Sequence, residues 1–171
     1  KHMSILAVSL LALVACTPEK KQEADYSQYV NPMIGTDFTG NTYPGAQVPF
    51  GMVQLSPDNG LPGWDRISGY FYPDTTIAGF SHTHLSGTGA GDLYDISFMP
   101  VTRPYKEAPA PLGIYSTFSH NDEAASAGYY RVLLKDYNIN VELTATERCG
   151  IQRYTFPEAE ASVFLNLKKA M

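Results

Sequence analysis

The chain has 171 residues, room for about one domain, and 44% of them are hydrophobic, which suits a globular protein and exceeds what a disordered chain carries. Charged residues make up only 17%, whereas Gly, Pro, Tyr and Phe are plentiful, so the composition favours strands and shaped loops over helical bundles. The net charge of −5 argues against a nucleic-acid partner, because neutralising phosphates requires clustered Lys and Arg.

The N-terminus carries the pattern of an export signal. Residues 4–15 form an apolar run that is too short to cross a bilayer and has the length of a signal-peptide core. The run ends in LVAC (13–16), which resembles the bacterial lipobox. We therefore predict a lipoprotein signal peptide at 1–15, lipidation of Cys16, and a polar tether at 16–27 that leads from the membrane to the fold. The alternative is a buried apolar helix that ends in a cysteine by chance.

The region from residue 30 to about 111 is rich in turn-forming residues. Pairs such as Asn31-Pro32, Pro44-Gly45 and Pro62-Gly63 recur every few positions, and we predict short apolar strands at 52–55 and 96–99 between them. Long shaped loops of this kind usually carry function.

From Gly113 onward the sequence alternates with a period of two. Apolar residues occupy every second position at 130–134, 141–145 and 163–167, and turn signals separate these runs. We predict an all-β fold, an antiparallel β-sandwich with long Gly/Pro-rich loops, and no helix longer than about eight residues after Cys16. We expect Cys149 to be a half-buried thiol at the end of a strand.

The segment Gly63-Trp64-Asp65-Arg66 contains the only tryptophan of the chain. An indole ring can stack on the C–H face of a pyranose, and the neighbouring carboxylate and guanidinium can bind sugar hydroxyls. The alternative is a tryptophan that covers the core, with Asp65 and Arg66 forming a local ion pair.

Two histidines, His82 and His84, lie in a glycine-rich segment and would point the same way in an extended chain. This pairing occurs at zinc sites, but no spacing supplies a third ligand, so hydrogen-bonded or substrate-facing histidines remain the stronger interpretation. The run GTGAG (87–91) is not a nucleotide fingerprint, and the chain has no serine-hydrolase elbow.

Several motifs resemble the opening of glycoside hydrolase family 92, the calcium-dependent exo-acting α-mannosidases. They are VNPMIGT (30–36), YPGA (43–46), PFGMVQLSPD (49–58), SGYFY (68–72), GFSHTHLSGTGAGD (79–92), FSH (118–120) and AGYYRVLLKDYNINVELTATERCGIQRYTFP (127–157). The resemblance spans nearly all the chain after the tether, in the family's order.

The resemblance implies an N-terminal β-sandwich at residues 28–171, incomplete at its C-terminal end, that packs against a C-terminal (α/α)6 barrel absent from this chain. The whole protein would hydrolyse terminal α-linked mannose, with an α-1,2 linkage expected, and would do so with inversion. The general-acid Glu, the general-base Asp and the calcium ligands would lie in the absent barrel, so we expect no catalytic residue and no metal ligand here.

The resemblance also implies a set of positions that face the substrate. They are Gly35, Thr36, Trp64, Asp65, Arg66, His82 and His84. Trp64 and Asp65 would contact mannose on the leaving-group side, and Gly35 would line the pocket.

The expected partners are mannose-containing glycans, the protein's own (α/α)6 domain, and a membrane through the lipid anchor. The expected location is the bacterial outer membrane, facing the periplasm or the cell surface. The alternative function is a non-catalytic carbohydrate-binding lipoprotein or an inactive fragment.

Overall fold

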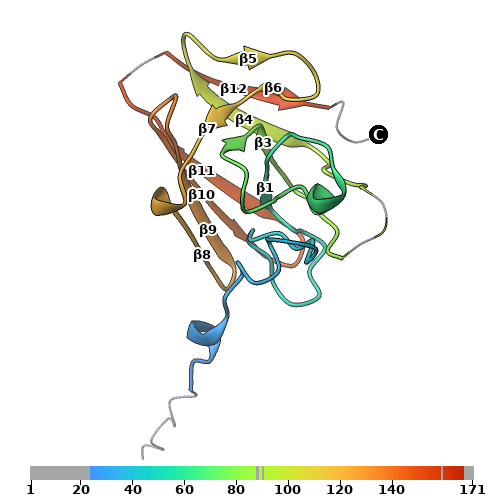
Figure 1. Ribbon diagram of the computed structural model, residues 1–171. Helices are drawn as coiled ribbons and strands as arrows, with labels where there is room; N and C mark the ends of the chain where they lie inside the picture. Colours follow the sequence, from blue (N-terminus) through green and yellow to red (C-terminus); the bar gives the residue numbers. More distant parts are fainter. Residues whose placement is uncertain (1–23, 88, 90, 159, 168–171) are drawn as a thin grey trace, which may run out of the picture.

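The computed structural model describes residues 24–167 except 88, 90 and 159. The predicted signal peptide, the lipidation site Cys16 and most of the predicted tether lie outside the described residues. The described chain begins with an N-terminal stem that projects from the body and carries the 3₁₀ turn η2 (Ser27–Tyr29) (Figure 1).

One four-stranded antiparallel sheet combines three strands from the loop-rich half with the last strand of the chain. Its strands are β1 (Ser56–Asp58), β3 (Gly79–Ser81), β4 (Ser97–Thr102) and β12 (Ala161–Asn166), in the order β1-β3-β4-β12. β12 therefore returns from the far end of the chain to pair with β4.

The second antiparallel sheet is a meander of consecutive strands. It consists of β8 (Glu123–Ser126), β9 (Tyr129–Leu134), β10 (Ile139–Ala145) and β11 (Gly150–Thr155), in the order β11-β10-β9-β8. Short turns join these strands, which explains the close spacing of turn signals in this half of the sequence.

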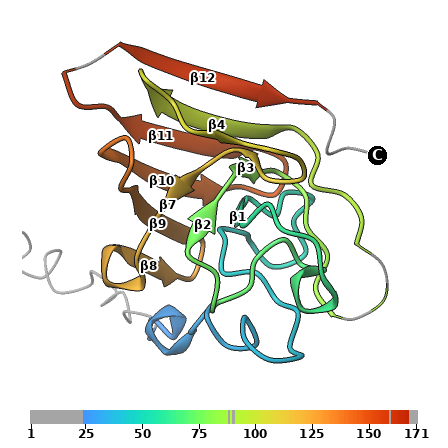
Figure 2. The same cartoon turned by 45° about the horizontal axis from the view of Figure 1, so that its top comes forward.

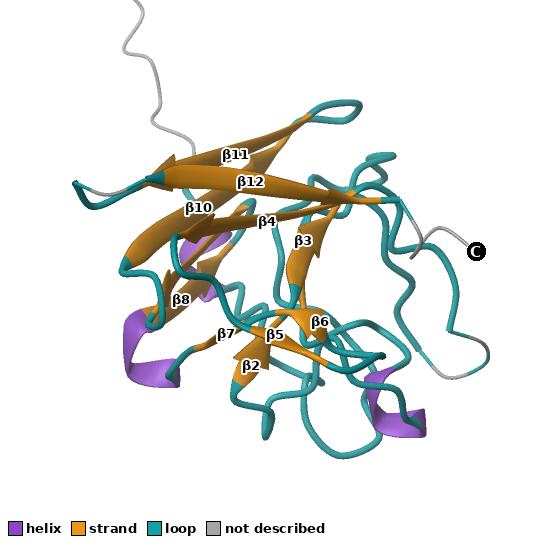
Figure 3. Cartoon of the chain, turned by 90° about the horizontal axis from the view of Figure 1, so that it is seen from above, coloured by secondary structure: helices purple, strands orange, loops and turns teal. Residues whose placement is uncertain are grey.

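The remaining strands form two short antiparallel pairs. β2 (Thr76–Ile77) pairs with β7 (Ser116–Thr117), and β5 (Glu107–Ala108) pairs with β6 (Gly113–Ile114). Two further 3₁₀ turns are η3 (Trp64–Arg66) and η4 (His120–Asp122). Figure 2 shows the two larger sheets, and Figure 3 shows the long loops that connect the strands.

The core lies between the two sheets because each contributes alternate apolar side chains. Val141 lies opposite Val132, and Leu143 lies opposite Tyr130, and all four are buried. Phe80 and Met99 of the other sheet belong to the same cluster. This arrangement confirms the predicted all-β fold with antiparallel sheets, and no α-helix occurs in the described part of the chain.

Three details differ from the expectations. In β12 it is Phe164, opposite Met99, that packs on the core, whereas Val163 and Leu165 are about half exposed, so the predicted apolar face of this strand is the outer one. Cys149 is exposed because the turn between β10 and β11 holds it, rather than a strand end. The apolar segment at 52–55 is irregular, with a single bridge from Leu55 to Ala46.

Within the described residues, no helix has the length and apolar character needed to span a bilayer.

Candidate functional site

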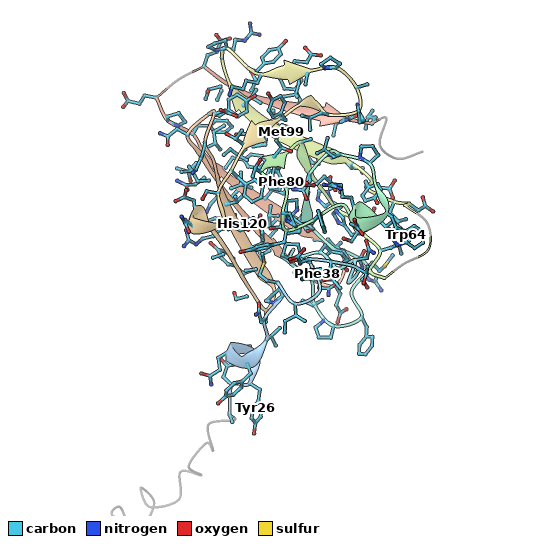
Figure 4. All side chains as sticks on the ribbon, viewed as in Figure 1. Tyr26, Phe38, Trp64, Phe80, Met99 and His120 are labelled. Carbon is cyan, nitrogen blue, oxygen red and sulfur yellow. The ribbon has the colours of Figure 1, made fainter. Side chains whose placement is uncertain are left out.

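The loop between β1 and β2 presents the tryptophan. The 3₁₀ turn η3 (Trp64–Arg66) follows Gly63, whose φ of +152° few other residues adopt. Trp64 is 60% exposed, and in Figure 4 it lies at the edge of the molecule. The interpretation of this residue as a cover over the core is therefore wrong, and the indole is accessible to a ligand.

Arg66 holds the loop together instead of pointing outward. Its guanidinium donates two hydrogen bonds to Asp74, Nε to Oδ2 at 2.7 Å and Nη2 to Oδ1 at 2.5 Å, and lies 4.7 Å from the ring centre of Phe71. These hydrogen bonds to Asp74 raise the pKa of Arg66. Asp74 occupies Nε and Nη2 of the guanidinium, so the Asp65–Arg66 ion pair of the alternative interpretation does not form. Arg66 nevertheless lines the neighbouring cavity.

A cavity of about 450 Å³ lies beside this loop. Gly63, Arg66 and Ile67 contribute one wall, while Tyr94 and Asp58 contribute to the other side. The Tyr94 hydroxyl donates to the Ile67 carbonyl oxygen, so the two walls are connected. Burial, with a smaller contribution from the charges of Asp58 and Asp92, raises the pKa of Tyr94 to about 12.

His84 lies beneath the cavity in a buried polar network. Nδ1 is 2.7 Å from the Gln54 carbonyl oxygen, and Nε2 is 2.9 Å from Asp58 Oδ1 and 3.1 Å from Ser81 Oγ. The imidazole ring also packs against Tyr43 and Tyr94. With its side chain fully buried, His84 cannot touch a substrate directly, which corrects that expectation.

His82 lies apart from the tryptophan loop. Its Nδ1 is 3.3 Å from the Ile96 carbonyl oxygen, and its ring packs against Phe98 and next to Gly150. It lines a different cavity, between β4, β11 and β12. The two histidines therefore do not form a pair, and the described residues contain no group of three or more His, Cys, Asp or Glu side chains that could hold a metal ion.

Gly35 and Thr36 shape a tight turn that supports the loop. A Cβ on Gly35 would lie 2.8 Å from Thr42 Oγ1, and its φ is +84°. The buried Thr36 hydroxyl donates to the Met33 carbonyl, and the Thr36 carbonyl accepts from the Tyr72 amide at 2.8 Å. The Thr36 side chain is thus structural here, while its backbone ties the turn to the end of the tryptophan loop.

The sequence did not single out a second buried network at Glu123. Its carboxylate accepts hydrogen bonds from the Tyr70 and Tyr130 hydroxyls, and it lies 2.6 Å from His120 Nδ1. Burial first, and then the charge of Glu123, raises the pKa of both tyrosines, so the phenols remain donors. The SGYFY and FSH segments, which contain Tyr70 and His120, stood out in the sequence, but nothing in them indicated that both side chains would contact Glu123.

The fold and the loop define a β-sandwich domain that presents an accessible indole beside a cavity. The sequence profile of the glycosyl hydrolase family 92 N-terminal domain matches residues 29–171, so the chain belongs to this family.

Solved structures of the family share the fold. The α-mannosidase BT3965 from Bacteroides thetaiotaomicron, solved alone and with mannoimidazole, is 45% identical, with a TM-score of 0.78 over 84% of this chain and 20% of its own. The inverting mannosidase BT2199 from the same organism is 31% identical, with a TM-score of 0.68 over 85% of this chain and 20% of its own.

A curated relative, an uncharacterized secreted glycosidase from Arthroderma benhamiae, is 27% identical over 94% of this chain and 21% of its own length. The chain thus spans about a fifth of the relatives that it matches.

Proposed function

We propose that this chain is the N-terminal domain of an exo-acting α-mannosidase, and that it completes the pocket in which terminal α-linked mannose is cleaved with inversion. Its membership of family 92 and its 45% identity to an α-mannosidase solved with mannoimidazole support the proposal. The observation that carries it is Trp64, an exposed indole on a firmly held loop beside a cavity.

In this proposal Trp64 stacks on the apolar C–H face of a sugar on the leaving-group side. Aromatic rings in partly polar surroundings suit such contacts, because the ring buries apolar surface while the hydroxyls stay hydrogen-bonded. Asp65, next to the indole and partly exposed, accepts hydrogen bonds from sugar hydroxyls. Gly35 shapes the neighbouring turn, and the preferred linkage is α-1,2.

The reacting groups belong to the part of the protein that follows this chain. Inverting hydrolysis needs a carboxylic acid that protonates the leaving oxygen and a carboxylate that activates water, about 6.5–9.5 Å apart so that the water fits. We place calcium binding, like the two carboxylates, in the (α/α)6 domain that the family resemblance implies. There the ion would help to bind and distort the sugar.

The proposed location is outside the cytoplasm, on a lipid anchor at Cys16. The LVAC motif supports lipidation, and the relative from Arthroderma benhamiae is named a secreted glycosidase. Metabolic labelling with a fatty-acid analogue would test the anchor, since a Cys16→Ala variant should lose the label.

Hydrolysis of an aryl α-mannoside tests whether residues 16–171 can catalyse the reaction alone. We expect the intact protein to release the aryl group and residues 16–171 alone to release none, even with added calcium, because both reacting carboxylates are missing. Robust turnover by residues 16–171 would contradict the proposal. Mannose binding by calorimetry without turnover in the intact protein would favour a non-catalytic carbohydrate-binding lipoprotein instead.

A further inference from the structure

Two histidines of the described chain share one bonding pattern. In each, one ring nitrogen contacts a main-chain carbonyl oxygen and the other contacts a buried carboxylate. His84 lies 2.7 Å from the Gln54 carbonyl and 2.9 Å from Asp58. His120 lies 2.7 Å from the Tyr72 carbonyl through Nε2 and 2.6 Å from Glu123 through Nδ1. The side chains of the two carboxylates are only 4% and 2% exposed.

These distances determine where hydrogens lie. A carbonyl oxygen can only accept, so the ring nitrogen that faces it carries a hydrogen. Glu123 accepts from two tyrosine hydroxyls, and one hydrogen must lie between His120 Nδ1 and Glu123 Oε2, because two lone pairs cannot face each other at 2.6 Å. Between His84 Nε2 and Asp58 Oδ1 one hydrogen must lie, because otherwise two lone pairs would face each other at 2.9 Å.

The two pairs contact residues on either side of the segment 59–71, which carries Trp64. Asp58, the last residue of β1, directly precedes this segment, and Tyr72 directly follows it. The ends are also joined to each other, since the Asn59 amide donates to the Gly69 carbonyl at 2.8 Å and the Asn59 side chain accepts from the Phe71 amide.

Aromatic rings hold each imidazole in place. His84 packs between Tyr43 and Tyr94, and His120 stacks on Tyr72 with ring centres 3.9 Å apart and an angle of 10° between the planes. Each imidazole is therefore held so that its Nε2 faces a residue bordering 59–71, which is Asp58 for His84 and the Tyr72 carbonyl for His120.

We propose that His84 and His120 are positioning residues that clamp residues 59–71 at both ends through hydrogens shared with Asp58 and Glu123, so that Trp64 is held in one orientation. Neither histidine touches the substrate in this account. The consequence for sugar recognition rests on the proposed function, whereas the clamp itself does not.

Hydrogen exchange of the intact protein, read by mass spectrometry on peptides covering 59–72, tests the clamp. His84→Leu and His120→Leu each remove a hydrogen bond to a carboxylate, so we expect amide exchange in these peptides to accelerate about tenfold or more. His82→Leu is the matched control, because His82 lies outside the loop's contacts, and it should leave exchange there unchanged. Unchanged exchange in both folded test variants would overturn the proposal.

Replacing the two carboxylates by amides tests whether the clamp depends on the hydrogen bond to each histidine or only on the volume of the side chains. Asp58→Asn and Glu123→Gln keep the shape and can donate to the facing ring nitrogen, so we expect near wild-type exchange at 59–72, whereas Asp58→Leu should match His84→Leu. If a leucine variant unfolds the chain, the amide variants decide alone, and faster exchange at 59–72 in both of them overturns the proposal. No mannoside is needed, so failure of the proposed function would show in turnover and leave this result intact.

Discussion

Trp64 and His84 come from the same loop-rich half of the chain, yet the fold uses them in opposite ways. Trp64 is left open to solvent, whereas His84 is enclosed and fully hydrogen-bonded. More than half of the Trp64 surface is open, so a ligand or a partner domain can bury it, as the proposed function requires. A buried, paired imidazole is explained by what it holds in place.

Gly69 has no room for a side chain. A Cβ there would lie 2.8 Å from Asp58 Oδ1, 3.0 Å from His84 Cδ2 and 3.1 Å from Tyr94 Cε1, and the φ of +87° disfavours other residues. Gly69→Ala should therefore lower the free energy of unfolding by about 1–3 kcal/mol, measured by urea denaturation. Gly91→Ala is the control, since its Cβ would meet only Tyr94 Oη, at 3.5 Å, and should change stability by less than about 0.5 kcal/mol. Equal effects would contradict the packing around the His84 network.

Tyr43 and Tyr94, which flank His84, lose their phenolic protons at a higher pH than an ordinary tyrosine does. Burial raises the pKa of each phenol to about 12, so the folded chain keeps both protons where the unfolded chain, with an ordinary tyrosine pKa of about 10, has lost them. Their contribution to stability is complete below about pH 10 and is lost as the pH rises through about 12. Urea denaturation over this range should show a smaller decline for the Tyr43→Phe/Tyr94→Phe double variant, and an identical decline would contradict the burial of these rings.

At the scale of elements, regular strands were predictable and loops were not. β9 and β10 follow from strict alternation, because only one face of each meets the core. β12 has apolar residues on both faces, so alternation alone could not decide that Phe164 turns inward. The segment 52–55 is apolar but satisfies its backbone irregularly, through bonds from Met52 to Glu147 and from Gln54 to His82.

The ion pair inside the tryptophan loop should contribute measurably to stability. Asp74 accepts two hydrogen bonds from Arg66, and the side chains are only 8% and 22% exposed. Asp74→Ala leaves a partly buried guanidinium without its partner and should cost about 1–3 kcal/mol in thermal unfolding. The matched control is Asp122→Ala, whose pair with Lys135 is exposed and should be worth less than about 1 kcal/mol. A larger loss at Asp122 would contradict this ranking.

At the scale of the whole molecule, motifs identified the family but did not place the side chains. The resemblance did not indicate that Asp74 would bind Arg66, or that Asp58 would bind His84, a residue that it named as substrate-facing and that is buried. These partners are 8 and 26 positions away in the sequence, and no spacing rule predicts such contacts. Trp64 could be identified because a lone tryptophan between polar residues and glycines stands out without any knowledge of the fold.

In the proposed function the domain supplies one side of a binding site, and it spans about a fifth of the length of its relatives. The exposed Trp64 lies in a loop and not in either sheet. The account therefore depends on Trp64 contributing to transition-state binding in the intact protein.

The most direct test is kcat/KM of the intact protein on a terminal α-mannoside. Trp64→Ala should lower kcat/KM roughly fivefold to 150-fold, which corresponds to about 1–3 kcal/mol, because one stacking contact is lost. Tyr26→Ala is the control, since Tyr26 is also largely exposed but lies on the N-terminal stem, away from Trp64 (Figure 4), and it should leave kcat/KM unchanged. Wild-type kinetics in a folded Trp64→Ala protein would contradict the account.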